Sequence, residues 1–162
     1  MIIRRPRLEE IESIRALLED EVRAGRMLPR PVNDIRAHLG DWLVAEEYGQ
    51  VIGCVSLVYY NAALCEVRSL VVDPGYRGRG IAAQLVQTAL AMARVQGMRQ
   101  VLALTRAAHV FEKAGFQIDQ VTNFPEKVWR DCAPCPFRYA CDEVALVFDL
   151  AEIPEEVWLP TA

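Results

Sequence analysis

The stretch VRSLVVDPGYRGRGIA, residues 67–82, decides the fold of this chain. Its first six residues form an apolar strand pattern, which Asp73-Pro74-Gly75 ends with a turn signal. Residues 81–95 are rich in Ala, Leu and Gln and contain no proline, which predicts a helix. The stretch therefore predicts a strand, a glycine-rich turn and a helix in direct succession.

The glycine-rich turn has the features of an anion-binding site. Gly78 and Gly80 let the backbone approach a ligand, and the first amides of the next helix have no partner within it. The helix dipole, Arg77 and Arg79 add positive charge. We expect the turn to bind the phosphate of a cofactor; the alternative is an ordinary turn before a surface helix. It matches neither G-x-x-x-x-G-K-[ST] nor G-x-G-x-x-G.

The strand before this turn is irregular. Its apolar side chains alternate poorly from Leu64, and the phase changes between Val67 and Leu70. One extra residue in a strand sends every later side chain to the opposite face. The pattern therefore predicts a β-bulge.

Two motifs resemble those of a known enzyme superfamily. Arg77, Gly80 and Ala82 form R-x-x-G-x-A, which resembles the acetyl-CoA pyrophosphate loop of the GCN5-related N-acetyltransferases (GNAT). Residues 111–116 resemble the second signature of that superfamily, a helix that ends at a glycine, here Gly115. The resemblance implies a mixed α/β fold, whose central, largely antiparallel sheet is splayed at a bulged strand and flanked by helices.

The resemblance also implies acetyl-CoA as the co-substrate. The backbone of the bulged strand would bind the pantetheine arm, the glycine-rich turn would bind the pyrophosphate, and the helix of the second signature would lie beside the cofactor. The implied cofactor residues are Leu70, Val71, Val72, Arg77, Gly78, Arg79, Gly80, Ile81, Ala82 and Phe111.

Further segments resemble the short, single-domain N-acetylglutamate synthases. These segments are residues 26–30, Gly53-Cys54, Glu66, residues 104–106 with 109–111, and residues 124–143. The resemblance implies direct acetyl transfer to the α-amine of glutamate, the first step of arginine biosynthesis. Two alternatives stay open: acetylation of another small amine or amino acid such as glutamine, and a catalytically silent acetyl-CoA-binding regulatory module. We find no amino-acid-kinase segment, which leaves inhibition by arginine open.

Few groups are needed for the chemistry. A charged ammonium cannot attack a thioester, so a base must remove a proton, and Glu66 matches the base position of the synthases. Backbone amides near Leu70 could stabilise the oxyanion. Phe111 stands where the superfamily often has a tyrosine acid, so the general acid is unidentified. Thr105 could orient a water molecule, or simply end a strand.

Arginine side chains bind carboxylates bidentately, so they are candidate anchors for glutamate. Arg30 follows the loop that passes over the acceptor in the synthases, and Arg68 shares a strand with Glu66. Lys127 and Arg130 are further candidates from residues 122–142. For each cation alone, a solvated surface charge is the alternative.

Three cysteines have a spacing that is typical of metal-binding sites. Cys132 and Cys135 form C-x-x-C, and Cys141 follows six residues later. They are weak candidates for a structural zinc site, with Asp131, Asp142 or His109 as a fourth ligand; free or oxidised thiols are the alternative. Cys54 and Cys65 fall in strand patterns, which predicts that they are core residues.

The composition is that of a small enzyme. The chain has 162 residues, of which 52% are hydrophobic, and its net charge of −4 argues against nucleic acid as a partner. We expect one domain over residues 1–150, with a long Cys-containing loop over 122–142, and a tail over 151–162. Apolar stretches too short for a membrane and five cysteines without a secretion signal predict a cytoplasmic protein. Its partner would be a small amino acid, and a homodimer is a further expectation.

The remaining patterns predict a mixed set of elements. Leu8, Ile11, Ile14, Leu18 and Val22 mark one face of a helix that ends near Gly25. Asn33 would cap a second helix that runs to Leu39. Predicted strands cover residues 2–4, 42–45, 51–60, 101–105, 116–121 and 143–150, another strand begins at Leu64, and a last helix covers 107–114.

Overall fold

The computed structural model describes residues 1–138 and 141–152. Their contacts form two compact units, one of Met1–Val58 with Val67–Ala89 and one of Tyr59–Glu66 with the residues from Leu90 onward. Strand β4 (Leu64–Val72) contributes its first three residues to the second unit and the rest to the first. Seven strands form one sheet in the order β1-β2-β3-β4-β5-β7-β6, which confirms the predicted mixed α/β fold.

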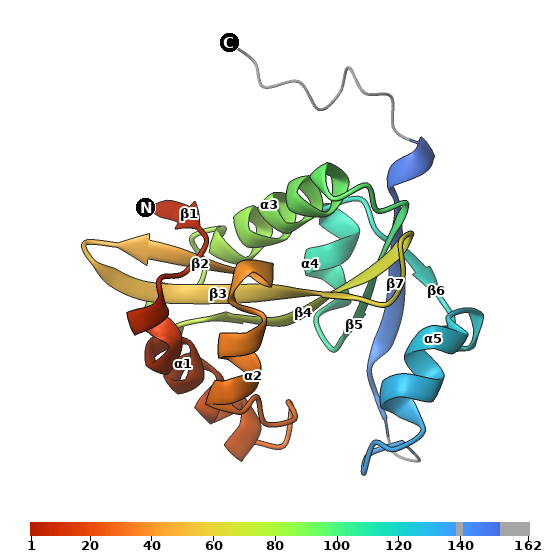
Figure 1. The fold of residues 1–162 in the computed structure, drawn as a ribbon, viewed down its shortest axis with the longest axis horizontal. Coiled ribbons are helices and arrows are strands. Elements are labelled where there is room, and N and C mark those ends of the chain that lie inside the picture. Colours follow the sequence, from red (N-terminus) through yellow and green to blue (C-terminus); the bar gives the residue numbers. More distant parts are fainter. Residues whose placement is uncertain (139–140, 153–162) are drawn as a thin grey trace. The chain divides into compact units, whose positions relative to one another are not determined.

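The first unit contains a three-stranded antiparallel meander that continues to β4. Its strands are β1 (Ile2–Arg4), β2 (Trp42–Glu47) and β3 (Gln50–Tyr59), and the β2–β3 hairpin is the orange-to-yellow ribbon in Figure 1. Tyr48 and Gly49, at the tip, have φ angles of 51° and 79°. Positive φ at both central residues is the geometry of a type I′ turn, whose twist matches that of the strands.

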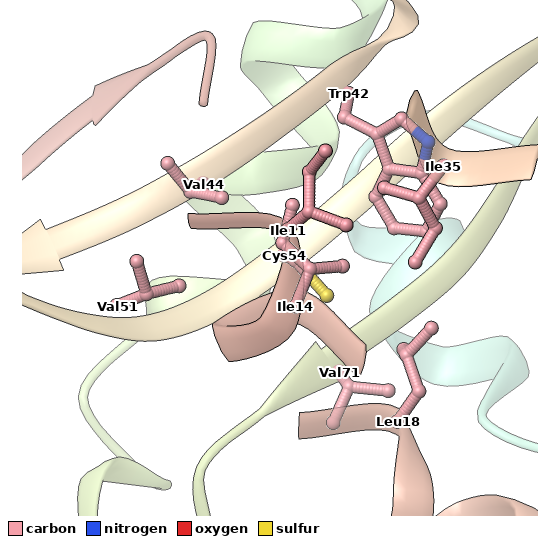
Figure 2. Close-up of a cluster of buried hydrophobic side chains, with 9 residues drawn as sticks. All are labelled: Ile11, Ile14, Leu18, Ile35, Trp42, Val44, Val51, Cys54 and Val71. Carbon is pink, nitrogen blue, oxygen red and sulfur yellow. The ribbon is translucent and has the colours of Figure 1, made fainter. Parts of the chain in front are cut away.

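Helices α1 (Ile11–Arg23) and α2 (Val32–Ala37) supply the core of the first unit. The spacing of the buried residues on α1, at positions 11, 14 and 18, is that of a single helical stripe. Figure 2 shows this stripe meeting side chains from α2, β2, β3 and β4. The cluster consists of Ile11, Ile14, Leu18, Ile35, Trp42, Val44, Val51, Cys54 and Val71.

Helix α3 (Ile81–Val95) begins on the other face of β3. A Cβ atom on Gly53 would lie 3.2 Å from Leu85 Cδ1 and 3.5 Å from Ile81 Cγ2. The absence of a side chain at Gly53 therefore lets the helix pack closely against β3. The neighbouring side chain of Cys54 points to the α1 face, as the alternation of a strand requires. The bounds of α3 are those predicted from the sequence.

The second unit contains β5 (Gln100–Thr105), β6 (Gln117–Asp119) and β7 (Val144–Asp149), with β7 antiparallel to both. Helix α4 (Ala108–Lys113) places Phe111 against Phe116, with ring centroids 5.2 Å apart. Gly115 follows this helix with a φ of 101°, which confirms the predicted helix end.

The predicted loop over residues 122–142 is wrong in its first half. A short turn at Val121–Asn123 leads into α5 (Pro125–Lys127), which continues as a π-helix over Val128–Cys132. Pro125 is favourable at the first helical position because its missing N–H has no partner there. Phe124, which is 5% exposed, anchors the start of the helix.

Two details of the predicted helices are also wrong. Asn33 does not cap α2 but lies inside it, where its Oδ1 accepts a hydrogen bond from Arg36 Nη1. The helix begins after Pro31, whose extended ψ of 147° suits a residue outside the helix. Leu8 is 62% exposed because it lies in a 3₁₀ turn that precedes α1.

Residues 139–140 of the predicted loop and 153–162 of the predicted tail lie outside the described residues. Among the described residues, none of the helices has the length and apolar character that crossing a bilayer requires.

Candidate active site

The glycine-rich turn lies where the sequence predicts it, between β4 and α3. Asp73 Oδ1 accepts a hydrogen bond from the backbone N–H of Gly75, 2.8 Å away, which fixes the first turn after the strand. Gly78 and Gly80 have φ angles of 78° and 76°, a left-handed conformation that residues other than glycine rarely adopt. The turn therefore leads directly into the N-terminus of a 15-residue helix.

Both arginines of the turn contact carboxylates in the first unit. The Arg79 guanidinium donates two hydrogen bonds to Glu47, at 2.7 and 3.0 Å, and these lower the pKa of that carboxyl. Arg77 Nε donates to the carbonyl oxygen of Val72, and its Nη2 lies 3.9 Å from Glu21. Because both side chains are about half-exposed, a phosphate could replace these carboxylates.

The predicted irregularity of β4 is centred on Ser69. This buried residue has a φ of 56°, a left-handed conformation that costs energy for a residue other than glycine. Its Oγ accepts a hydrogen bond from Arg30 Nε, 3.3 Å away. The structure therefore places Arg30 beside the strained residue that directly precedes Leu70. Sequence reasoning identified Arg30 but missed Ser69, although the phase change pointed to its position.

Arg68 is half-buried on the same strand, and its carbonyl oxygen accepts a hydrogen bond from Ser56 Oγ at 3.1 Å. The predicted role of its guanidinium in binding the acceptor stays a prediction.

Glu66 is the centre of a buried polar cluster in the second unit. The residue is 3% exposed. Lys127 Nζ lies 3.0 Å from each of its carboxylate oxygens, and the Tyr60 hydroxyl lies 2.5 Å from Oε2. Asp131 Oδ2 lies 2.8 Å from the same hydroxyl and 3.3 Å from Lys127 Nζ. We call Glu66, Tyr60, Lys127 and Asp131 the Glu66 cluster.

The helix over residues 125–132 brings two members of this cluster together. Lys127 and Asp131 are four residues apart and therefore share one helical face. Between them, Arg130 stacks its guanidinium 5.2 Å from the centre of the Tyr60 ring and donates a hydrogen bond to the Tyr59 carbonyl oxygen. Lys127 and Arg130, predicted as acceptor anchors, thus contact the candidate base and its tyrosine partner.

Sequence reasoning missed Tyr60 and considered Asp131 only as a metal ligand. Tyr60 ends an apolar strand pattern, where an aromatic residue carries no functional signal. Asp131 could have been found from its position one helical turn after Lys127, had a helix been predicted there.

Thr105 and Phe111 have identifiable local contacts. Thr105 Oγ1, at the end of β5, accepts a hydrogen bond from the Ala107 backbone N–H at 2.9 Å. Phe111 is 3% exposed and packs in the core of the second unit. The predicted roles of Thr105 with a water molecule and of Phe111 beside the cofactor stay predictions.

The cysteines are free thiols. Cys54 and Cys65 are buried core residues, as predicted, and burial raises the pKa of each to about 12. Burial also raises the pKa of Cys132. Within residues 1–138 and 141–152, no group of three or more His, Cys, Asp or Glu side chains could hold a metal ion. The structure therefore gives no support to a zinc site at Cys132, Cys135 and Cys141.

Comparison with known proteins yields consistent matches. Residues 38–118 match the model of the acetyltransferase (GNAT) domain. An uncharacterized N-acetyltransferase of Chlorobaculum tepidum is 39% identical over 145 residues, which cover 90% of this chain and 94% of that protein. The amino-acid acetyltransferase of Mycobacterium tuberculosis is 30% identical over 119 residues, with coverage of 71% and 67%.

A solved structure also matches most of the chain. It is the N-acetylglutamate synthase of Neisseria gonorrhoeae complexed with coenzyme A and N-acetyl-glutamate, with a TM-score of 0.79 and 25% identity. The match covers 92% of this chain but 35% of the synthase, so this chain is similar to one part of a longer protein.

Proposed function

The chain belongs to the acetyltransferase (GNAT) family, and from this membership we propose that it transfers acetyl from acetyl-CoA to the α-amine of L-glutamate. The amino-acid acetyltransferase among its relatives and the synthase among its structural neighbours support an amino acid as the acceptor. The finer choice of glutamate rests on the geometry at β4.

The observation that carries the proposal is the contact between Arg30 and Ser69. Glutamate presents a second carboxylate, and a guanidinium binds a carboxylate through two parallel hydrogen bonds. The bond from Arg30 Nε to Ser69 Oγ orients that guanidinium next to Leu70, where the bulged strand begins to bind the cofactor in our proposal. Arg68 would be a second cation on the same strand.

The chemistry proceeds by direct transfer in a ternary complex. Glu66 accepts a proton from the acceptor ammonium, and the amine nitrogen then attacks the thioester carbonyl. Backbone N–H groups near Leu70 stabilise the oxyanion. As the C–S bond breaks, the second proton of the former amine passes to the CoA sulfur, and CoA leaves as the thiol. Thr105, whose oxygen already accepts the Ala107 N–H, can donate its hydroxyl proton to a water molecule. The raised pKa values of Cys54, Cys65 and Cys132 disfavour a thiolate nucleophile.

The wider setting forms part of the proposal. The product would enter arginine biosynthesis, and five free thiols support a reducing, cytoplasmic environment. A homodimer stays an expectation.

The test is CoA release from acetyl-CoA by the purified protein, with glutamate compared against glutamine, aspartate, ornithine, lysine and polyamines. We expect the highest kcat/KM with glutamate. A preference for another amine would refute the choice of acceptor and retain the family. Binding of acetyl-CoA without turnover of any acceptor would favour the silent module.

A further inference from the structure

One hydroxyl group in the Glu66 cluster contacts two carboxylates. The Tyr60 oxygen lies 2.5 Å from Glu66 Oε2 and 2.8 Å from Asp131 Oδ2, and both distances are those of O–H···O hydrogen bonds. A tyrosine hydroxyl carries one proton, and an ionised carboxylate carries none. Two such bonds therefore need one more proton than Tyr60 supplies.

From this proton count we infer that Glu66, Tyr60 and Asp131 form a relay, which receives the proton from the acceptor at Glu66 and releases it at Asp131. The inference rests on the proposed function, because it assigns the path of the proton that the reaction removes. Tyr60 and Asp131 act through Glu66 and are positioning residues.

The direction of the relay follows from burial. The Glu66 side chain is 3% exposed, whereas that of Asp131 is 26% exposed and can exchange a proton with water. In the starting state Asp131 carries the extra proton and donates to Tyr60, which in turn donates to the Glu66 carboxylate. In the first step, the acceptor N–H bond breaks and a Glu66 O–H bond forms. Asp131 then releases its proton to water. Glu66 passes the new proton to the Tyr60 oxygen as Tyr60 passes its own proton to Asp131, which restores the starting state.

The other side chains hold the three oxygens in line. Lys127 Nζ donates to both carboxylates and compensates for their charge during each step. Arg130 stacks on the Tyr60 ring, and the ring packs against the core of Leu64, Leu102 and Phe124. The cluster is thus fixed from two sides, which a proton relay requires.

A carboxyl titration tests the sharing of the proton without any acceptor. The ¹³C carboxyl signals of Glu66 and Asp131, assigned with Glu66→Gln and Asp131→Asn, are followed with pH in the wild type, Tyr60→Phe and Tyr48→Phe. Tyr48 is fully exposed and serves as the matched control. Other ionisable groups surround this pair of carboxylates. Lys127 contacts both of them, and Cys65, Cys132 and Glu143 interact electrostatically with Glu66 over longer distances.

Two sites that share a proton titrate as a pair. We expect both signals to move together in the wild type and in Tyr48→Phe, and separately in Tyr60→Phe. Independent titration in the wild type, or an unchanged profile in Tyr60→Phe, would overturn the inference.

Kinetics test the path. Asp131→Asn should lower kcat for glutamate by about 100-fold, the lower range for a positioned acid–base group, with little change in KM. A small diffusible buffer such as imidazole should raise kcat of this variant and leave the wild type unchanged, because the buffer replaces the lost proton carrier. Asp131→Glu, which retains a carboxylate, should recover activity.

An unchanged kcat in Asp131→Asn, or a loss that no buffer restores in a folded variant, would contradict the relay. Failure of the wild type to acetylate any amino acid would contradict the proposed function instead, and the titration would still decide the inference.

Discussion

Glu66 is a carboxylate that is buried together with its hydrogen-bond donors. A buried charge is costly unless it is paired, and here Lys127 and Tyr60 both donate to Glu66. Such a pair adds little to stability against an apolar replacement, but removal of one partner leaves an uncompensated charge. The arrangement therefore fixes the position of Glu66 more than it stabilises the fold.

Lys127→Met should reduce the free energy of unfolding by about 3 kcal/mol, because it leaves the Glu66 carboxylate without its cation. The double variant Glu66→Gln/Lys127→Met should recover much of that loss. Urea unfolding of the wild type, both single variants and the double variant measures this coupling. Additive losses would show that the two side chains do not interact.

Arg30→Gln should raise the KM for glutamate by about 10- to 100-fold, since a charge-assisted pair is worth about 1.5–3 kcal/mol. The affinity for acetyl-CoA should stay unchanged. Steady-state kinetics measure both, with Arg36→Gln on the exposed side of α2 as the matched control. An equal effect in the two variants would remove Arg30 from acceptor binding.

Glu10 provides a pH-dependent contribution to stability. Hydrogen bonds from Arg4, at 2.7 and 2.9 Å, and from the Arg7 backbone N–H lower the pKa of this carboxyl from 4.5 to about 2. A lowered pKa in the folded state stabilises the protein above pH 4.5, and this stabilisation is lost as the pH falls toward 2.

Glu10→Gln should therefore reduce the free energy of unfolding by about 2–3 kcal/mol at pH 7. The difference from the wild type should shrink between pH 4.5 and pH 2. Denaturant unfolding at several pH values measures it, and a constant difference across that interval would contradict the assigned role of the carboxylate.

Among the elements, those with apolar periodicity could be predicted and the helix over 125–132 could not. Helix α3 and the glycine-rich turn follow from local pattern, because the residues that form them also carry the signal. The face of the missed helix combines Phe124 and Val128 with Lys127 and Asp131. Two charged residues at inward positions hide the helical stripe, since their burial depends on Glu66 and Tyr60 from another segment.

Two glycines separate the two ways in which an added side chain lowers stability, backbone strain and steric overlap. Gly115 has a φ of 101°, and a Cβ there would lie 2.9 Å from Phe148 Cε2; Gly97 has a φ of 78° with no atom within 4 Å. Gly97→Ala should therefore cost about 1 kcal/mol from backbone strain alone. Gly115→Ala should cost about 2–4 kcal/mol, because the Phe148 ring must also move. Chemical denaturation compares the two, and equal losses would mean that the ring yields freely.

In the whole molecule, the predicted site residues divide between the two units. The glycine-rich turn, Arg30 and Ser69 belong to the first, and the Glu66 cluster belongs to the second, while β4 contributes to both. The cofactor turn could be found from the sequence because its residues are consecutive. The partners of Glu66 could not be found in this way, because Tyr60 and Asp131 are 71 positions apart in the sequence and only the fold brings them together.

The central claim is that this chain acetylates glutamate with Glu66 as the base. The most direct measurement is kcat for N-acetylglutamate formation by the wild type and by Glu66→Gln, with acetyl-CoA binding measured on both. We predict turnover by the wild type and a kcat about 100- to 10,000-fold lower in Glu66→Gln, with equal acetyl-CoA affinity. Equal kcat values in the two proteins would contradict the account.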